Sequence, residues 1–363
     1  MVGHITGKNQ NLPILSHVLL KTEGGNLKLS STNLEIAVSV LVRGRVEADG
    51  ECAAPAKLLL DYVSLLPAGK VELVFTQDAL EVRADGNVTS IKTMPASEFP
   101  LIPKLAKGAA YHLDADALRQ AIGQVAFAVS ASDARPELSG VSCTFHGQVG
   151  VGKLVMAATD SYRLSERTLT LAPGSVDTEA RLIVPARTLL EVGRILSGYK
   201  DEMTSQTLVE WAVTESQLVV TFGNVELVSR LIEGSFPDYR QIIPTQFKAV
   251  IQVRRADLAK AIRAASLFAR QGLFDVHLAL SADGQLKISS ADTGVGSHST
   301  TLSVQGTFQD QQVTINYKYM NDGLAAMGTE QVTIHLIDSM NPLVVRPAQD
   351  EEGFQYIVMP IRA

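Results

Sequence analysis

The sequence contains few of the features that mark secreted or membrane proteins. Its two cysteines, Cys52 and Cys143, lie far apart in 363 residues. They exclude a disulfide framework and favour a reducing compartment, of which the cytoplasm is the simplest. No apolar run approaches the ~20 residues of a membrane-spanning helix, and the chain does not start with the basic and then apolar segments of a secretory signal. We therefore expect a cytoplasmic protein without membrane contact.

Recognisable catalytic and metal-binding patterns are also missing. The seven histidines are scattered singly, and none has the spacing to a second histidine or a cysteine that metal sites use. No phosphate-binding loop, dinucleotide-binding glycine motif or nucleophile elbow occurs. The absence of these motifs predicts a protein with no catalytic residues, no metal and no cofactor.

Positive charge is in slight deficit. The 32 Lys and Arg residues against 38 Asp and Glu residues give a net charge of −6. This balance argues against a protein that coats nucleic acid with its whole surface. It leaves room for a single basic face, so the positions of Lys and Arg matter more than their number.

What the sequence does contain is a threefold internal repeat of about 130 residues. Three segments alternate apolar and polar residues on either side of a polar turn: LKLSSTNLEIAVSV (27–40), LVMAATDSYRLSERT (154–168) and LKISSADTGVGSHST (286–300). Each predicts a β-hairpin, with Asn33, Asp160 or Asp292 in the turn. A repeat of this length indicates duplicated domains and not a solenoid.

Each hairpin is followed by a predicted helix with a basic residue at its start. The segments are PAKLLLDYVSLLPAG (55–69), PARTLLEVGRILSGY (185–199) and NYKYMNDGLAAMGTE (316–330). They place Lys57, Arg187 and Lys318 at one position of the repeat, about 130 residues apart. Proline at two of the starts and glycine near all three ends suit the first and last turns of a helix.

A second helix precedes the hairpin in the last two copies only. ADALRQAIGQVAFAVSAS (115–132) matches RADLAKAIRAASLFARQG (255–272), whereas the first copy has too few residues there for a strand and a helix. We predict three domains of one α+β fold, with antiparallel sheets and helices on one face. Their predicted bounds are 1–105, 106–246 and 247–363, and the first should lack one strand and one helix.

The predicted helix over 257–270 has an apolar and a basic side. Asp257 is its predicted N-cap. The buried stripe should contain Leu258, Ile262, Ala265 and Ala269, and the basic side Lys260, Arg263 and Arg270. Such a basic side is either a solvated surface or one that faces phosphates, and the repeated basic positions on the other helices favour phosphates. Leu267, with Phe268, falls near the basic side and is either ordinary surface or a partner contact.

One stretch, AATDSYRLSERT (157–168), gathers charged, hydroxyl and aromatic side chains. A hydrolase or transferase could use Asp160, Tyr162, Arg163 and Glu166. No nucleophile and base are visibly paired, however, and such clusters more often hold a turn together. A β-rich adaptor that binds proteins without DNA is a further alternative.

Four motifs resemble those of a known family. LPIL (12–15), ATDSYRLS (158–165), FPDYRQIIP (236–244) and YIVMPIRA (356–363), in a chain repeated three times, resemble the bacterial DNA polymerase III beta subunit, the sliding clamp. The resemblance implies a processivity factor without enzymatic activity. It also implies a head-to-tail homodimer whose six domains form a ring around duplex DNA, with sheets outside, basic helices inside and no sequence preference.

The resemblance further implies where partners bind. Polymerase subunits, the clamp loader and repair proteins would insert short peptides with Leu and Phe anchors into a groove between the second and third domains. The groove residues would be Leu138, Thr159, Ser161, Tyr162, Arg163, Leu164, Pro237, Gln241, Ile242, Leu273, Asn316, Tyr319, Met340, Pro342, Ile357, Met359, Pro360, Ile361 and Arg362. Ser161-Tyr162 stands where the family usually has Gly-His, and Gln241 where Arg is common, so the preferred peptide stays open.

The basic helix positions and the resemblance together assign two further sets of residues. The DNA-facing residues would be Lys8, Lys57, Arg119, Arg135, Arg187, Arg194, Lys260, Arg263 and Lys318, with Lys8 and Arg135 in loops that match DNA-contact loops of the family. The dimer interface would pair an edge strand around Thr89 and Ile91 across the joint, with Leu267 and Phe268 packed against it.

Overall fold

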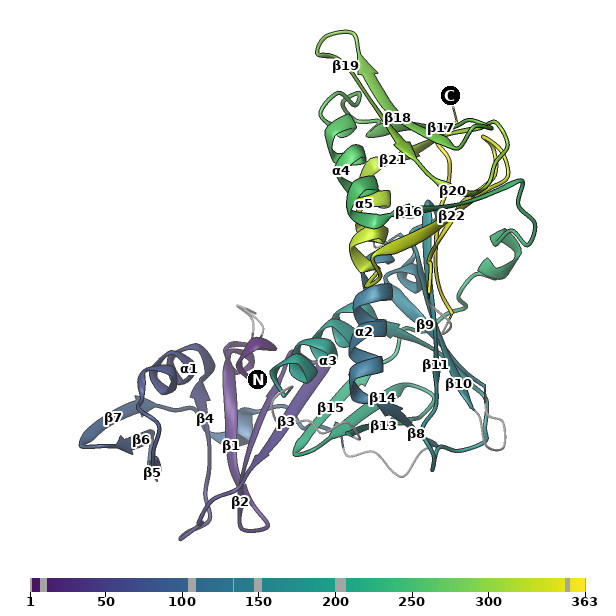
Figure 1. Ribbon diagram of the computed structural model, residues 1–363. Coiled ribbons are helices and arrows are strands. Elements are labelled where there is room, and N and C mark those ends of the chain that lie inside the picture. Colours follow the sequence, from purple (N-terminus) through teal and green to yellow (C-terminus); the bar gives the residue numbers. More distant parts are fainter. Residues whose placement is uncertain are drawn as a thin grey trace. The chain divides into compact units, whose positions relative to one another are not determined.

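Figure 1 shows a computed structural model of the chain. It describes residues 2–6, 12–103, 109–132, 134–146, 152–199, 207–349 and 353–362. These residues fall into two compact units. The first unit comprises Met1–Ala115, Ala172–Val176 and Arg194–Leu231, and the second comprises Asp116–Leu171, Asp177–Gly193 and Ile232–Ala363.

The described residues of the first repeat form one α-helix among antiparallel strands. Its elements are the 3-10 helices η1 (Val2–His4) and η2 (Pro13–Ser16), strands β1 (His17–Glu23), β2 (Asn26–Thr32), β3 (Ile36–Val42) and β4 (Glu51–Pro55), helix α1 (Ala56–Leu65), strands β5 (Glu72–Thr76), β6 (Ala79–Ala84) and β7 (Asn87–Lys92), and η3 (Ala96–Glu98). No described residue before β1 belongs to a strand or an α-helix.

The second repeat has the same series of elements, preceded by a strand and a helix. These are β8 (Ala109–Asp114) and α2 (Ala115–Val125), followed by η4 (Ala126–Ala128) and η5 (Pro136–Leu138). The series itself is β9 (Gly140–His146), β10 (Lys153–Thr159), β11 (Arg163–Thr170), β12 (Ala180–Pro185), α3 (Ala186–Gly198), β13 (Leu208–Val213), β14 (Gln217–Phe222) and β15 (Val225–Arg230), with η6 (Tyr239–Ile242) after it.

The third repeat also begins with a strand and a helix. Its elements are β16 (Ala249–Arg254), α4 (Arg255–Ser266), β17 (Asp275–Leu280), β18 (Gln285–Asp292), β19 (Gly296–Ser303), β20 (Gln305–Thr307), β21 (Gln311–Asn316), α5 (Tyr317–Ala326), β22 (Gln331–Leu336), β23 (Leu343–Pro347) and β24 (Phe354–Val358). Hairpins therefore form at all three predicted places, because β2–β3, β10–β11 and β18–β19 pair antiparallel.

Each of the two large sheets joins strands from neighbouring repeats. The first unit holds a sheet in the order β4-β1-β2-β3-β15-β14-β13-β8, and the second holds one in the order β12-β9-β10-β11-β24-β23-β22-β16-β20. The joints are β3–β15, where Val38 pairs with Leu227, and β11–β24, where Ser165 pairs with Tyr356. Among the described strands, β5 and β7 form the edges of the sheet β5-β6-β7, and β19 and β21 form those of β19-β18-β17-β21.

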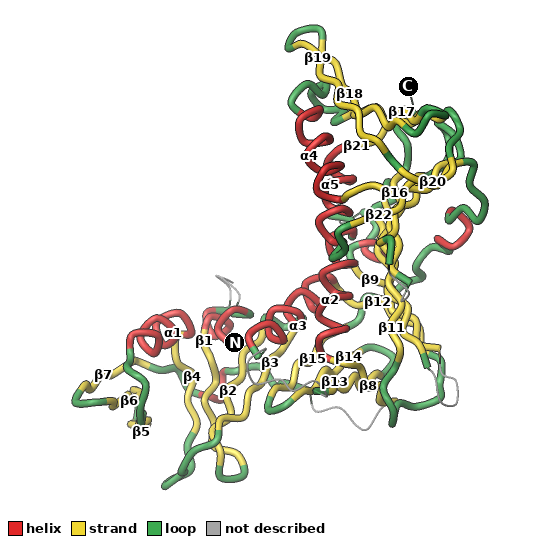
Figure 2. The backbone as a smooth tube through the Cα atoms, viewed as in Figure 1, coloured by secondary structure: helices red, strands yellow, loops and turns green. Residues whose placement is uncertain are grey.

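The predicted α+β class is confirmed. Within the second unit, α4 and α5 lie side by side on one side of the strands (Figure 2). Within the described part of the chain, no helix combines the length and the apolar character needed to cross a membrane.

Helix α4 is shorter at its C-terminal end than the sequence pattern predicts. It starts after Arg254 as N-cap, so Asp257 lies in the first turn and is not the cap. It ends at Ser266 because Asp275, a buried carboxylate, accepts the backbone N–H of Arg270 at 3.2 Å and its Nε at 2.9 Å. Arg270 is therefore ion-paired beyond the helix, and its placement on the basic side of the helix was wrong.

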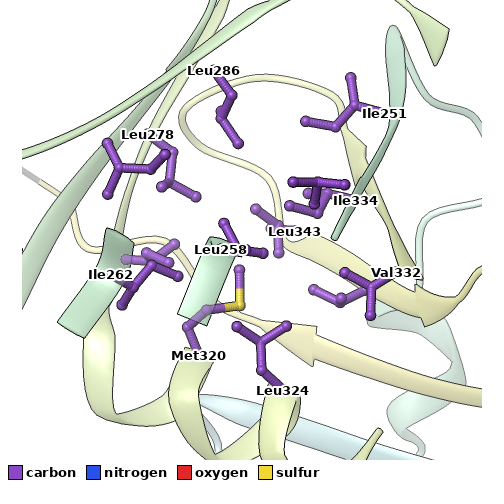
Figure 3. Packing of buried hydrophobic residues seen from close by; sticks show 14 of the residues in the cluster. Ile251, Leu258, Ile262, Leu278, Leu286, Met320, Leu324, Val332, Ile334 and Leu343 are labelled. Carbon is purple, nitrogen blue, oxygen red and sulfur yellow. The ribbon is translucent and has the colours of Figure 1, made fainter. Parts of the chain in front are cut away.

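The core of the third repeat lies between its two helices and its strands. Leu258 and Ile262 of α4 meet Met320 and Leu324 of α5, with Ile334 of β22 beside them (Figure 3). The predicted buried positions 258, 262 and 265 are confirmed, whereas Ala269 is only partly buried because the helix has ended before it.

His335 on β22 is held in a site that disfavours its charged form. Its ring lies 4.8 Å from that of Phe247, and its Nε2 lies 3.0 Å from Thr333 Oγ1. Its buried Nδ1 has no hydrogen-bond partner among the described residues. Burial, and then the charge of Arg346, lower the pKa of His335 from 6.5 to about 4.

Acidification is therefore expected to destabilise the fold partly through His335. Between pH 6.5 and 4 the unfolded chain binds a proton that the folded chain does not, so the free energy of unfolding falls as the pH falls. The variant His335→Gln should lose up to about 2 kcal/mol less than the wild type between pH 7 and pH 5. Urea unfolding at both pH values measures this difference, and equal losses in the two proteins would contradict it.

Candidate functional site

The turn between β10 and β11 is built by its own side chains. Thr159 Oγ1 donates to the carbonyl of Arg163 at 2.6 Å and accepts the N–H of Ser161 at 3.0 Å. Asp160 Oδ1 accepts the backbone N–H groups of Tyr162 at 2.9 Å and of Arg163 at 3.0 Å. This pattern is an Asx-type turn, in which a carboxylate replaces a backbone acceptor. It presents the side chain of Tyr162 outward.

The first repeat contains the same turn between β2 and β3. There Thr32 Oγ1 accepts the N–H of Leu34 at 3.0 Å, and Asn33 Oδ1 accepts two further backbone N–H groups. Leu34 and Ser161 share a left-handed conformation, with φ of 77° and 78°. Both residues thus stand where glycine would be least strained. Because the turn recurs, Asp160 is scaffolding and not a catalytic acid.

Arg163 ties this turn to two other segments of the second unit. Its Nε donates to Asp160 Oδ2 at 3.0 Å, its Nη1 to Asp322 Oδ2 at 2.6 Å, and its Nη2 to the carbonyl of Phe127 at 3.1 Å. The guanidinium also lies 4.7 Å from the ring centroid of Tyr319. Three of its five N–H donors make these bonds, two of them to carboxylates, and its side chain is largely buried. Arg163 therefore positions the site and is poorly placed to bind an acidic ligand.

The C-terminal tail runs alongside this turn. The ring of exposed Tyr162 stacks on that of Tyr319, with centroids 6.5 Å apart and planes inclined by 19°. The N–H of Met359 donates to the carbonyl of Tyr162 at 2.9 Å, and that of Ile361 to the carbonyl of Thr314 at 2.8 Å. The tail thus lies between the β10–β11 turn and β21, with Met359, Pro360 and Ile361 half-buried.

Three large apolar side chains of the predicted groove set are exposed on other segments of the unit. Ile242 is 41% exposed at the end of η6, Leu273 46% before β17 and Met340 55% in the turn before β23. Asp338 holds that turn by accepting the N–H of Met340 at 2.9 Å. Gln241 is exposed, and its Nε2 donates to Asp238 Oδ2 at 2.8 Å.

Other members of the predicted set support the surface from within. Leu138, Thr159, Leu164 and Ile357 are buried, and Leu164 pairs with Ile357 across β11–β24. Asn316 caps α5 through a 2.9 Å bond from the N–H of Lys318. Pro237 and Pro342 are half-buried and Arg362 is exposed.

Glu166 has a structural role that its sequence context does not reveal. Its Oε2 accepts the hydroxyl of Tyr239 at 2.6 Å and its Oε1 the amide of Gln355 at 2.7 Å. Burial, and then the carboxylate of Glu166, raise the pKa of Tyr239. Glu166 therefore links η6 to the β11–β24 joint. The roles of Phe127, Asp322 and Gln355 were missed, because their partners are distant in sequence.

The three repeated basic residues occupy equivalent helix positions. Lys57, Arg187 and Lys318 are the second residues of α1, α3 and α5, and all three are exposed. Cations at this end oppose the helix dipole and do not stabilise the helix. Lys318 Nζ also lies 3.5 Å from the ring centroid of Phe274.

The remaining basic residues of the predicted DNA-facing set differ in environment. Lys260 and Arg263 are exposed on α4, whereas Arg194 on α3 is half-buried. Arg119 pairs with Asp116 at 3.2 Å, and Arg135 pairs with Glu137 at 3.0 Å. Lys8 lies outside the described residues.

The predicted interface residues lie in edge strand β7 and directly after α4. Thr89 and Ile91 are in β7, but Ile91 is buried in the core of its own domain and only Thr89 is half-exposed. Leu267 is 73% exposed at the C-cap of α4. The ring of Phe268 stacks on that of His298 in edge strand β19, with centroids 5.9 Å apart. The pair thus follows the helix end and does not lie on its basic side.

Comparisons with known proteins match nearly the whole chain to one protein family. Models of the N-terminal, central and C-terminal domains of the DNA polymerase III beta subunit match residues 2–103, 112–238 and 240–362. The beta sliding clamp of Staphylococcus aureus is 26% identical over 361 residues, covering 97% of this chain and 92% of the relative. A crystal structure of the sliding clamp of Pseudomonas aeruginosa bound to griselimycin matches with a TM-score of 0.91 and 27% sequence identity. A crystal structure of the sliding clamp of Bacillus subtilis matches with a TM-score of 0.90 and 25% sequence identity. Both alignments cover 100% of this chain and 95% of the other.

The fold and site define a non-catalytic protein built from three copies of one α+β domain. The chain belongs to the bacterial DNA polymerase III beta subunit family, the sliding clamps, which act as processivity factors in DNA replication. The resemblance seen in the sequence is confirmed, and the hydrolase or transferase alternative is wrong.

Proposed function

We propose that two copies of this chain assemble head to tail into a closed ring around duplex DNA. The observation that carries this proposal is the pairing rule within the chain. The second strand of the repeated hairpin in one repeat pairs with the last strand of the next repeat, as β3–β15 and β11–β24. By the same rule β19 would pair with β7 of a second copy, and both are edges among the described strands. Two such heterologous joints close a dimer.

The joints within the chain also predict the register of this contact. Alignment of the hairpins makes Val38, Ser165 and His298 equivalent, and likewise Leu227, Tyr356 and Thr89. Because Val38 pairs with Leu227 and Ser165 with Tyr356, His298 should pair with Thr89 of the second copy. Phe268, stacked on His298, would then cover the joint, while Ile91 stays in its own core.

The site beside the C-terminal tail is proposed to bind peptides of other replication and repair proteins. Polymerase subunits, the clamp loader and repair proteins are the expected partners. Exposed Tyr162, Ile242, Leu273 and Met340 supply apolar contacts for Leu and Phe side chains, and the ordered tail supplies backbone groups that can orient an extended peptide.

The exposed basic residues of the helices are proposed to face the DNA backbone. Lys57, Arg187 and Lys318 recur at one helix position, and Lys260 and Arg263 add charge on α4. Contact with phosphates alone would give binding that is strong at low salt and independent of sequence, which suits a clamp that slides.

Topological trapping tests this function directly. The protein, loaded by its cognate loader onto nicked circular DNA, should stay bound in high salt and leave within minutes after the DNA is linearised. In a separate equilibrium assay, Lys260→Ala with Arg263→Ala should reduce the log–log salt slope by up to about 1.8. Lys287→Ala, exposed on β18, is the control and should leave the slope unchanged. Retention on linear DNA, or an unchanged slope in the double variant, would contradict the proposal.

A further inference from the structure

The loop between α4 and β17 holds an aromatic residue in a strained backbone conformation. Phe274 has a φ of 55°, in the left-handed region where bulky side chains are rarely found. The backbone N–H groups of Leu273 and Phe274 both donate to the carbonyl of Arg270 at 3.2 Å, and Arg270 is ion-paired with buried Asp275. Such strain persists only where surrounding contacts fix the conformation, and it often marks a binding site.

The contacts that fix Phe274 come from the start of α5. The carbonyl of Phe274 accepts the N–H of Tyr317 at 2.9 Å, and the two rings meet edge to face with centroids 5.9 Å apart. The ammonium nitrogen of Lys318 lies 3.5 Å from the ring centroid of Phe274. A cation over an aromatic face is attracted by the quadrupole of the ring. One end of the loop is therefore fixed by Arg270 and Asp275, and the other by Tyr317 and Lys318.

The other two repeats have no ring at this position. The registers of β1 with β4, β9 with β12 and β17 with β21 make Ser16, Ser139 and Phe274 equivalent. A serine offers no aromatic face to Lys57 in the first repeat or to Arg187 in the second. The basic residue at the helix start is thus common to all three repeats, whereas a ring for it to contact at this place is specific to the third.

The two ends of the loop enclose a residue of the proposed peptide site. Leu273 is 46% exposed and is one of the apolar residues proposed to contact partner peptides. A loop that is already held in place loses less conformational freedom when a peptide binds, so binding is tighter. Lys318 does not stabilise the helix that carries it, because a cation at the N-terminus opposes the helix dipole. Its contact with Phe274 stabilises the position of Leu273 instead.

We infer that Lys318 is a positioning residue of the peptide site. Its ammonium fixes Phe274 and, through Phe274, holds Leu273 where an apolar side chain of a partner peptide can meet it. This inference rests on the proposed peptide site. Lys57 provides the matched comparison, because it has the same place on its helix but no ring beside it, so its loss reports the removal of a helix-start cation alone.

Amide exchange in the free protein tests the first link without any peptide. Lys318→Met keeps the apolar stem and removes the charge, so it should speed exchange of the Leu273 and Phe274 amides about two- to fivefold. Lys318→Arg should keep exchange slow, because a guanidinium also binds an aromatic face. Lys57→Met should leave this loop unchanged. Equal exchange in the wild type and Lys318→Met would overturn the proposal.

Peptide affinity tests the second link. A fluorescent peptide with Leu and Phe anchors is titrated by anisotropy, and Lys318→Met should weaken it about two- to fivefold. Lys318→Arg and Lys57→Met should both bind as the wild type does. In a Leu273→Ala background, Lys318→Met should cause no further loss, because Lys318 acts through Leu273.

The outcomes separate this role from the peptide site itself. An equal loss in the wild-type and Leu273→Ala backgrounds, or a loss that Lys318→Arg does not restore, would overturn the positioning role. Unchanged affinity in Lys318→Met would also overturn it and would leave the peptide site standing. Failure of the wild type to bind the peptide would instead contradict the proposed peptide site.

Discussion

Replacing Leu267 and Phe268 by alanine is expected to convert the proposed dimer into monomers at micromolar concentration. Leu267 projects into solvent within one chain, and Phe268 is stacked on His298 of edge strand β19. Truncation of a buried interface anchor commonly costs about 1–3 kcal/mol, and in the proposed ring each anchor would act at both joints. Sedimentation velocity across a concentration series measures the shift.

A control separates loss of the interface from loss of the fold. Leu101 is 97% exposed and lies outside both edge strands, so Leu101→Ala should leave the dimer intact. The double variant should also keep its affinity for partner peptides, because the contacts that build that site, such as Arg163 to Asp322 and Met359 to Tyr162, do not involve Leu267 or Phe268. If wild type and double variant sediment as the same tight dimer, Leu267 and Phe268 do not lie at the joint.

Deleting residues 359–363 is expected to abolish peptide binding while leaving the domains folded. The deletion removes the half-buried side chains of Met359, Pro360 and Ile361 and the backbone bonds to Tyr162 and Thr314. It spares β24, which ends at Val358. A peptide with Leu and Phe anchors should bind the intact protein in the micromolar range, at roughly −8 kcal/mol. Fluorescence anisotropy gives the affinity, and thermal unfolding checks the fold.

Single substitutions define the site more finely. Tyr162→Ala removes the exposed ring that stacks on Tyr319 and should weaken the peptide about tenfold. Gln312→Ala, exposed on β21, should have no effect. Unchanged affinity after the tail deletion would place the peptide elsewhere on the molecule.

Local features were predictable because their causes are local. The turn at Asp160 depends on side chains within four positions of one another, and the apolar spacing of Leu258 and Ile262 follows from helix geometry alone. The end of α4 was not predictable, because the bonds of Arg270 to Asp275 depend on where the sheet places β17. Arg163 and Asp322, 159 residues apart in the chain, left no signal of their contact.

The sequence by itself determined the threefold repeat, the α+β class, the three hairpins and the family. These follow from alternation, helical spacing and short motifs, which are properties of neighbouring residues. Only the tertiary structure decided which strands join the repeats, since β3–β15 and β11–β24 are hydrogen-bonded between segments far apart in the chain. It also decided which of the described strands lie at the edges of their sheets. The backbone N–H and C=O groups of a strand can pair with any other strand of suitable length. Which strand becomes its neighbour therefore depends on side-chain packing across the whole sheet.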